Sequence, residues 1–128
     1  MYISDNNNSA VRKVTVSTGI ITTVAGTGAD GFSGDGGPAT SATMHDTFGI
    51  TLDQAGNLYI CDYYNYRIRK VTVSTGIIST FAGGGSGGDG VEATSSSLNI
   101  PLGVAVDSSG NKLFVFVFVP LLLVCLFP

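Results

Sequence analysis

The decapeptide RKVTVSTGII occurs twice in this chain, at Arg12–Ile21 and at Arg69–Ile78. The copies are 69 − 12 = 57 residues apart, and the match extends to Val11–Gly28 against Ile68–Gly85, where 14 of 18 positions are identical. Repeats of this length form units that bury their apolar faces against their neighbours. The duplication therefore predicts a stack of repeats.

Each copy has the pattern of a β-hairpin. Residues 11–16 alternate between two faces, Ser17-Thr18-Gly19 supplies a turn, and residues 20–25 return as a second β-rich run. The second copy repeats this pattern over 66–73 and 77–82. Both copies are therefore expected to contribute a pair of antiparallel strands.

Two further apolar runs precede the second hairpin. They cover residues 48–53 and 57–61, and the first of them is matched by 102–107, where each run ends in Asp. Four antiparallel strands within one 57-residue repeat, separated by Gly and Asp, are the pattern of a β-propeller blade.

The composition agrees with a β protein. The chain has 128 residues with 18 Gly, and eight of its nine acidic residues are Asp, a residue type typical of turns. The six Lys and Arg and the net charge of −3 exclude a polybasic nucleic-acid surface. Residues 1–10 lack the pattern of a signal peptide, and the cellular compartment is left open.

A long glycine-rich connection follows each hairpin. The connections run over 26–47 and 83–101, and the second is three residues shorter, so that later matches fall at an offset of 54. A short piece in each, at 39–44 and 93–98, has the character of a single helical turn.

These motifs resemble the NHL repeat. The resemblance covers about residues 1–115 and rests on an ordered string through one whole repeat: Phe48–Asp53, Gly56–Ile60, Asp62, Asn65 and Arg67–Val71. The GDGGPAT sequence at Gly34–Thr40 is similar to the connection of the teneurin-type NHL variant.

The resemblance implies an all-β fold of four-stranded antiparallel propeller blades, about six to a ring in the family. In this chain it implies an incomplete ring of about two blades and a partial third: a partial blade over 1–25, a full blade over 48–82 and the start of the next over 102–115. Two blades leave apolar faces uncovered. We therefore expect a fragment of a larger protein, or a chain that associates with other copies.

The C-terminal residues 116–128 depart from the repeat and form an apolar tail. Three interpretations are open. Residues 113–128 could anchor the chain in a membrane, although a span needs about 20 apolar residues. Residues 113–119 could instead form a buried strand. The third interpretation is that the coding sequence loses its frame near Lys112, so that the tail is not evolved structure.

No catalytic or cofactor-binding residues are predicted. NHL-type propellers bind proteins or RNA, act in adhesion or sensing, and in a minority of cases are lyases. His45 is the sole histidine and is matched by Asn99, which indicates a solvated loop position. The sequence therefore favours a non-enzymatic interaction module. The alternatives are a fragment of a lyase or lactonase-type propeller and a propeller fragment anchored by the tail.

The Asp-Gly loops also raise the possibility of calcium. Asp30, Asp35 and Asp89 are oxygen donors beside glycines, and they are weak candidate ligands for Ca²⁺. Their spacing fits neither an EF-hand nor a calcium-binding β-helix repeat. Ordinary turn chemistry is the favoured interpretation, so no metal or cofactor is predicted.

A protein is the favoured partner. Tyr63 and Tyr64 lie in the turn before a strand, and exposed tyrosines are enriched at protein interfaces. RNA is disfavoured because neighbours such as Arg69 and Lys70 point to opposite faces of a strand. We expect Arg12 and Arg69 to lie against apolar neighbours between blades.

Overall fold

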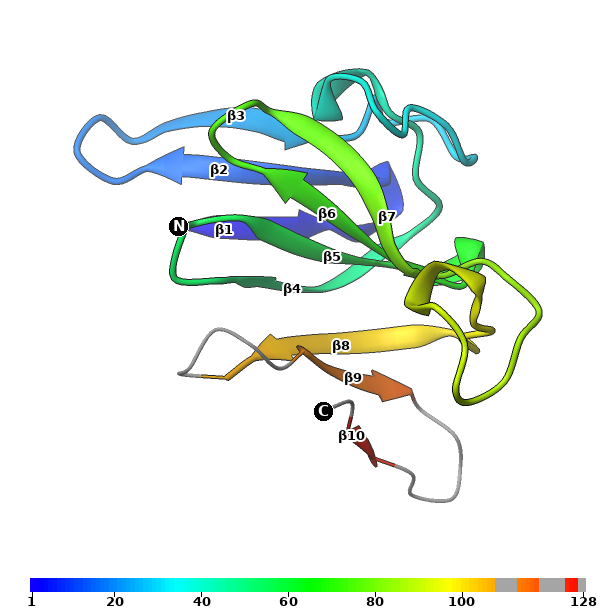
Figure 1. Ribbon diagram of the computed structural model, residues 1–128. Helices are drawn as coiled ribbons and strands as arrows, with labels where there is room; N and C mark the ends of the chain where they lie inside the picture. Colours follow the sequence, from blue (N-terminus) through cyan, green and yellow to red (C-terminus); the bar gives the residue numbers. More distant parts are fainter. Residues whose placement is uncertain (108–112, 118–123, 127–128) are drawn as a thin grey trace.

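The structure is a computed structural model that describes residues 1–107, 113–117 and 124–126, and within this part it contains three antiparallel sheets (Figure 1). Blade 1 consists of β1 (Tyr2–Asp5), β2 (Ala10–Thr15) and β3 (Ile20–Ala25). Blade 2 consists of β4 (Thr47–Leu52), β5 (Leu58–Asp62), β6 (Arg67–Thr72) and β7 (Ile77–Gly83). Blade 3 consists of β8 (Pro101–Val106), β9 (Leu113–Val117) and β10 (Val124–Leu126). The predicted all-β architecture of propeller-type blades is confirmed.

Short 3-10 turns connect the strands. Two of them, η1 (Asn6–Asn8) and η3 (Tyr63–Asn65), link the second and third strand positions of blades 1 and 2. The other two, η2 (Ala39–Ser41) and η4 (Ala93–Ser95), lie in the long connections, where the sequence indicated a helical turn.

The two hairpins share their backbone irregularities. A register shift lies between Val11 and Arg12 in blade 1 and between Ile68 and Arg69 in blade 2, at the same repeat position. Tyr66, expected to open a strand, is left-handed with φ of 56° and caps η3 instead. Its counterpart Ser9 has φ of 42° and caps η1, so that the repeat fixes the turn as well as the strands.

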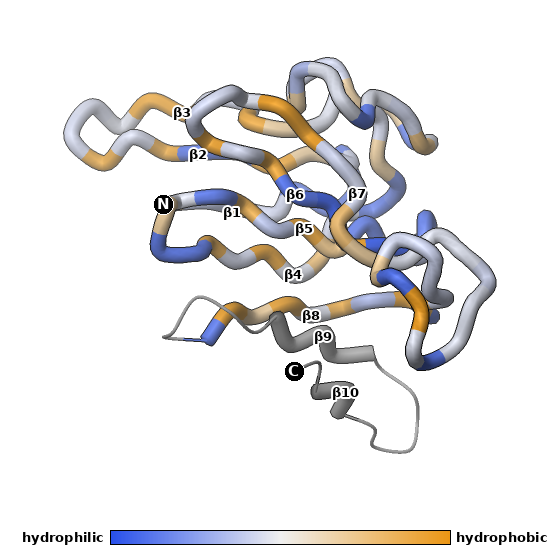
Figure 2. Tube along the Cα trace, viewed as in Figure 1, coloured by the Kyte–Doolittle hydropathy of each residue, from blue (hydrophilic) through white to orange (hydrophobic). Residues whose placement is uncertain are grey.

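The core lies between the blades. Apolar and polar residues alternate along the strands (Figure 2), and each face of blade 2 packs against a neighbour. All five residues of β5 are buried as a result. Leu58 and Ile60 join the cluster facing blade 1, whereas Tyr59 and Cys61 join the cluster facing blade 3.

The innermost strands of blades 2 and 3 meet backbone to backbone. β4 and β8 lie side by side in Figure 1, and a Cβ atom built on Gly49 would lie 2.7 Å from Cα of Gly103 and 2.7 Å from the carbonyl oxygen of Leu102. Gly49 and Gly103 are repeat equivalents. The missing side chain is therefore what lets neighbouring blades approach.

Part of the apolar tail extends blade 3. β9 pairs with β8, and β10 pairs with β9. Residues 108–112, 118–123 and 127–128 lie outside the described residues, so the interpretations of the tail stay predictions. Within the part that is described, no helix has the length and apolar character needed to cross a membrane.

We predict that Gly49→Ala destabilises the chain, because its methyl group would meet the backbone of β8 rather than a side chain that can move. Overpacking of this kind costs about 1–3 kcal/mol. Gly88→Ala is the matched control, since a Cβ there meets nothing within 4 Å. Urea unfolding should show a lower midpoint for Gly49→Ala alone, and equal midpoints would contradict the close approach of β4 and β8.

We also predict that the Cys61 thiol resists modification in the folded chain. Its side chain is buried, and burial raises the pKa of Cys61 to about 12. At pH 8 this leaves about one thiol in ten thousand ionised, against roughly one in four for a free cysteine. In a Cys125→Ser background, Ellman's reagent should react at least a hundredfold more slowly before than after unfolding in urea; similar rates would show that β5 is accessible.

Candidate functional site

A fully buried ion pair lies on the face of blade 2 that is directed at blade 1. Asp62 ends β5 and Arg69 lies on the neighbouring strand β6, so the antiparallel pairing brings them together. Nη1 of Arg69 donates to Oδ2 of Asp62 over 3.2 Å, and both side chains have no exposed surface. Asn65 donates to the other carboxylate oxygen over 2.7 Å.

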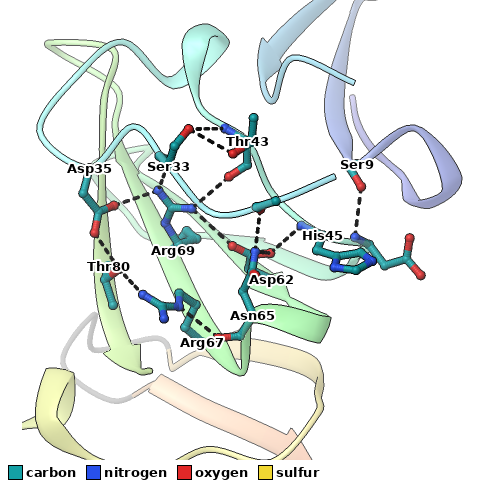
Figure 3. A network of polar contacts seen from close by, with 12 residues as sticks. Ser9, Ser33, Asp35, Thr43, His45, Asp62, Asn65, Arg67, Arg69 and Thr80 are labelled. Atoms are coloured by element: carbon teal, nitrogen blue, oxygen red, sulfur yellow. Dashed lines mark hydrogen bonds and ion pairs between the residues drawn. The ribbon is translucent and has the colours of Figure 1, made fainter. Parts of the chain in front are cut away.

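The connection that leaves blade 1 covers this pair. Nη2 of Arg69 donates to the carbonyl oxygen of Ser33 over 3.0 Å and to Oδ1 of Asp35 over 2.7 Å, and Nη1 donates to the carbonyl oxygen of Thr43 over 3.4 Å (Figure 3). Thr80 of β7 donates to the second oxygen of Asp35. The guanidinium therefore joins three segments that are distant in the sequence.

The two carboxylates respond differently to these surroundings. Burial raises the pKa of Asp62, opposed by hydrogen bonds from the His45 amide and Asn65 and by the charge of Arg69. Partial burial also raises the pKa of Asp35, but the hydrogen bond from Thr80 and the charge of Arg69 outweigh it and lower the pKa overall. Asp35 therefore stabilises the fold above a pH of about 3.8, and this contribution is lost on acidification through its folded pKa.

The same three residue types recur in blade 1. Arg12 Nε lies 2.9 Å from Oδ2 of Asp5, and Asn8 donates to Asp5 over 2.9 Å. This ion pair is partly open to solvent, with side-chain exposures of 32% and 30%. The full burial of Arg69 agrees with the expected position between blades, whereas Arg12 is partly exposed. The sequence analysis missed the network itself, although the retained spacing of Asp, Asn and Arg in both copies was a signal for it.

The three candidate calcium ligands have different surroundings. Asp35 is engaged by Arg69 and Thr80, as described above. Asp30 accepts a hydrogen bond from Ser9 over 2.7 Å, and Asp89 lies exposed in the second connection. Among the described residues, no three His, Cys, Asp or Glu side chains gather in a way that could hold a metal ion.

Tyr63 and Tyr64 belong to an aromatic cluster at one end of blade 2. The ring of Tyr63 packs on Phe48 with centroids 4.6 Å apart, Tyr64 packs on His45 at 4.8 Å, and the two tyrosine rings meet edge to face at 4.7 Å. Tyr64 is 47% exposed and Phe48 37%. The four rings form a partly exposed surface, which we call the aromatic cluster.

Backbone hydrogen bonds hold this cluster in place. The amide of Tyr63 donates to the carbonyl oxygen of Asp46 over 3.0 Å, and the amide of Tyr64 donates to that of His45 over 3.1 Å. The turn η3 is thereby attached to the end of the first connection. The side chains are presented by a fixed backbone rather than by a free loop.

A polar cleft of about 590 Å³ lies next to η3. It is formed where blade 2 meets the second connection, and its lining residues are Asn65, Tyr66, Arg67, Gly84, Gly85, Ser97, Leu98 and Asn99. Asn65 belongs to η3, so one residue of the turn that carries Tyr63 and Tyr64 also lines the cleft. η3 thus carries two tyrosine rings and borders a cleft that contains the side-chain amide of Asn99.

Comparisons with known proteins agree with the repeat motif. No family model matches the chain. It is 30% identical over 123 residues to NHL repeat-containing protein 2 of Bos taurus, covering 90% of this chain and 17% of that protein. It is 33% identical over 135 residues to Teneurin-4 of Mus musculus, covering 90% and 5%. The chain therefore spans less than a fifth of these relatives, and the predicted resemblance to NHL-repeat proteins is confirmed.

Solved structures from Bacteroides share the fold. A structural genomics protein of unknown function from Bacteroides thetaiotaomicron superposes with a TM-score of 0.73 at 28% identity, over 89% of this chain and 28% of that chain. An auxiliary nutrient binding protein from Bacteroides ovatus gives 0.67 at 21% identity, over 89% and 31%. A putative phosphatase from Bacteroides thetaiotaomicron gives 0.66 at 22%, over 89% and 29%.

We predict that Arg69→Met strongly destabilises the chain, because it leaves the carboxylate of Asp62 buried without its partner. Breaking a buried ion pair in this way costs about 3–5 kcal/mol. Arg12→Met removes the equivalent but solvent-exposed arginine and should cost a small fraction of that. The measurement is the free energy of unfolding in urea for both variants, and equal losses would show that the cover over Arg69 contributes nothing.

Proposed function

We propose, from the premise that this chain carries NHL repeats folded as β-propeller blades, that it is a non-enzymatic binding module for a protein segment. The proposed contact surface is the aromatic cluster, with Tyr63 and Tyr64 as the principal contacts. The single observation that carries this proposal is the fixed pair of tyrosine rings on η3, of which Tyr64 is 47% exposed.

The chemistry of this end of the molecule supports a peptide ligand. Tyrosine offers a large apolar face and a polar hydroxyl and loses little conformational entropy on binding. The cleft beside η3 adds the side-chain amide of Asn99, which can pair with backbone N–H and C=O groups of a bound segment, whereas the amide nitrogen of Asn65 is already engaged by Gly31 and Asp62. A short extended peptide would therefore find apolar and polar partners side by side.

The residue content supports a role without catalysis. The chain has one histidine, whose ring packs on Tyr64, and a catalytic zinc site commonly uses three protein ligands. The name of one relative describes repeats, and one structural neighbour is named for binding nutrients. Another is named a putative phosphatase, which makes phosphate-ester hydrolysis the activity to test against.

The test begins with selection of peptides from a phage-displayed random library on the immobilised chain. Selected peptides are then titrated against the wild type, Tyr64→Ala and Phe81→Ala. Tyr64→Ala should bind at least about tenfold more weakly, as expected for an exposed aromatic at an interface. Phe81 is the matched control, a 37% exposed ring on β7 that lies outside the cluster.

Selection of no peptide, or equal affinity for Tyr64→Ala, would contradict the proposal. Hydrolysis of p-nitrophenyl phosphate with and without Mg²⁺, Ca²⁺ and Mn²⁺ is measured in parallel. The rate should equal that of the buffer. A saturable rate that copurifies with the chain would favour the enzymatic alternative.

A further inference from the structure

One continuous segment, residues 26–52, contacts both edges of the three strands β5, β6 and β7 and so completes blade 2. Its last part is β4, which pairs with β5 as the inner strand. Its first part lies along the outer strand: the amide of Gly36 donates to Ile78 and the amide of Ala39 donates to Gly76, each over 2.8 Å, and Ile78 donates back to Gly37 over 3.0 Å. Immediately before Gly36, Asp35 binds Arg69.

Blade 1 has no such segment among the described residues. β1 pairs only with β2, and β3 is the outer edge of its sheet. Positions that are buried in blade 2 by blade 1 and by the first connection are exposed in blade 1. Ile3 is 37% exposed where Ile60 has no exposed surface, and Ile21 is 56% exposed where Ile78 has none. Figure 2 shows the tip of the β2–β3 hairpin projecting beyond blade 2 with apolar residues on it.

The open surface of blade 1 carries the same residues as the surface of blade 2 that residues 26–52 contact. Ser17–Ile21 has the same sequence as Ser74–Ile78, the edge that binds Gly36–Ala39. Arg12 takes the place of Arg69, and Thr23 takes the place of Thr80. A segment built like residues 26–52 would therefore find its hydrogen-bond partners in blade 1.

The chain contains a second segment of this kind, Gly83–Val106. Its loop already has the required backbone: Gly90 has φ of 83° where Gly36 has 82°. The turns η4 and η2 match too, since Glu92 and Pro38 before them have φ of −55° and −59°. Asp89 occupies the position equivalent to Asp35, and its exposed carboxylate is accessible to an arginine.

The differences between the two segments also fit blade 1. In the first segment, the ring of Phe32 packs on the guanidinium of Arg67 at 3.6 Å. The second connection is three residues shorter and has no phenylalanine, and blade 1 has Ala10 at the position of Arg67. The phenylalanine and the arginine of this contact are thus both absent from the proposed pairing. No cation is left unpaired, and no ring is left to clash with blade 1.

We propose that Gly83–Val106 of one copy of this chain completes blade 1 of a second copy. Asp89 pairs with Arg12, the loop residues 90–93 bind the edge at Gly19–Ile21, and β8 exchanges its pairing with β9 for the open edge of β1. A groove of about 470 Å³ lies beside that edge, lined by Met1, Tyr2, Ile50, Thr51, Leu52 and Leu58. The contact joins unlike surfaces, so it links copies head to tail.

The glycine of β8 is required in this position. β8 of the first copy would lie beside β4 of the receiving copy. This contact would have the same geometry as the one between β4 and β8 within a single chain. Gly103 would then take the place that Gly49 has within one chain, where an added Cβ would lie 2.7 Å from the backbone of the neighbouring strand. The proposed strand exchange therefore demands glycine at position 103, a requirement that non-specific apolar association does not have.

The first experiment uses the full chain and a synthetic peptide of residues 83–107 that carries a fluorophore. Binding is measured by fluorescence anisotropy. Asp89→Arg in the peptide or Arg12→Glu in the chain should each weaken binding about tenfold or more, and combining them should restore most of the loss, as a double-mutant cycle requires. Gly103→Val in the peptide should abolish binding. Circular dichroism establishes that Arg12→Glu is folded.

The second experiment is light scattering of the full chain over a range of concentrations. The wild type should exceed the monomer mass of 13.1 kDa, Arg12→Glu should approach it, and Arg12→Glu combined with Asp89→Arg should again exceed it. The proposal is overturned by a monomer at every concentration, by assembly that ignores these substitutions, or by peptide binding that tolerates Gly103→Val. None of these results bears on the aromatic cluster, which is tested separately.

Discussion

The ion pair between Asp62 and Arg69 is the constraint on which the arrangement of the blades depends. Removing two charges from water costs several kcal/mol for each ion, and the pair is tolerated only where further hydrogen bonds satisfy both groups. Those bonds reach both terminal nitrogens of Arg69 from the connection that leaves blade 1, through Ser33, Asp35 and Thr43, whereas the buried Nε of Arg69 has no partner among the described residues. Blade 2 therefore cannot form its buried face on its own, because a neighbouring repeat supplies the groups that make burial of the charge acceptable.

The two blades show how far burial depends on context. The sequence from Arg12 to Ile21 is identical to that from Arg69 to Ile78, yet Arg12 is partly exposed and Arg69 is fully buried. The local backbone is the same in both, including the register shift that precedes each arginine. What differs is whether a connection lies over the sheet. In a repeat fold the local sequence determines the backbone of a strand, and the adjacent repeat determines how far its side chains are buried.

The strands, the turns between them and the blade architecture could be predicted from the sequence because each is encoded locally and encoded twice. Alternation, Ser-Thr-Gly turns and the repeat offset were sufficient for that. The ion-pair network could not be predicted in the same way, since Asp35 and Arg69 lie 34 residues apart and meet only when the connection packs on blade 2. Tyr66 shows a related difficulty. Its left-handed backbone belongs to a capped turn whose signal is the counterpart Ser9 rather than any property of tyrosine.

The candidate site was predicted in part for the same reason. Tyr63 and Tyr64 stand out as a polar-aromatic turn, but their contacts with His45 and Phe48 come from a segment on another strand. The calcium candidates show the reverse, because Asp-Gly sequences were visible whereas the arginine that engages Asp35 was not. A short motif shows which groups are available, and the fold determines which of them are already used.

His45 connects the structural network to the proposed binding surface. Its backbone amide donates to Asp62 over 2.8 Å, and its ring packs on Tyr64. Its carbonyl oxygen accepts the amide of Tyr64, so that both sides of this residue are fixed at once. The segment that makes the buried charge tolerable is thus the same segment that positions the aromatic cluster. The fixed position of the proposed binding surface therefore follows from the way the connection that leaves blade 1 packs on blade 2.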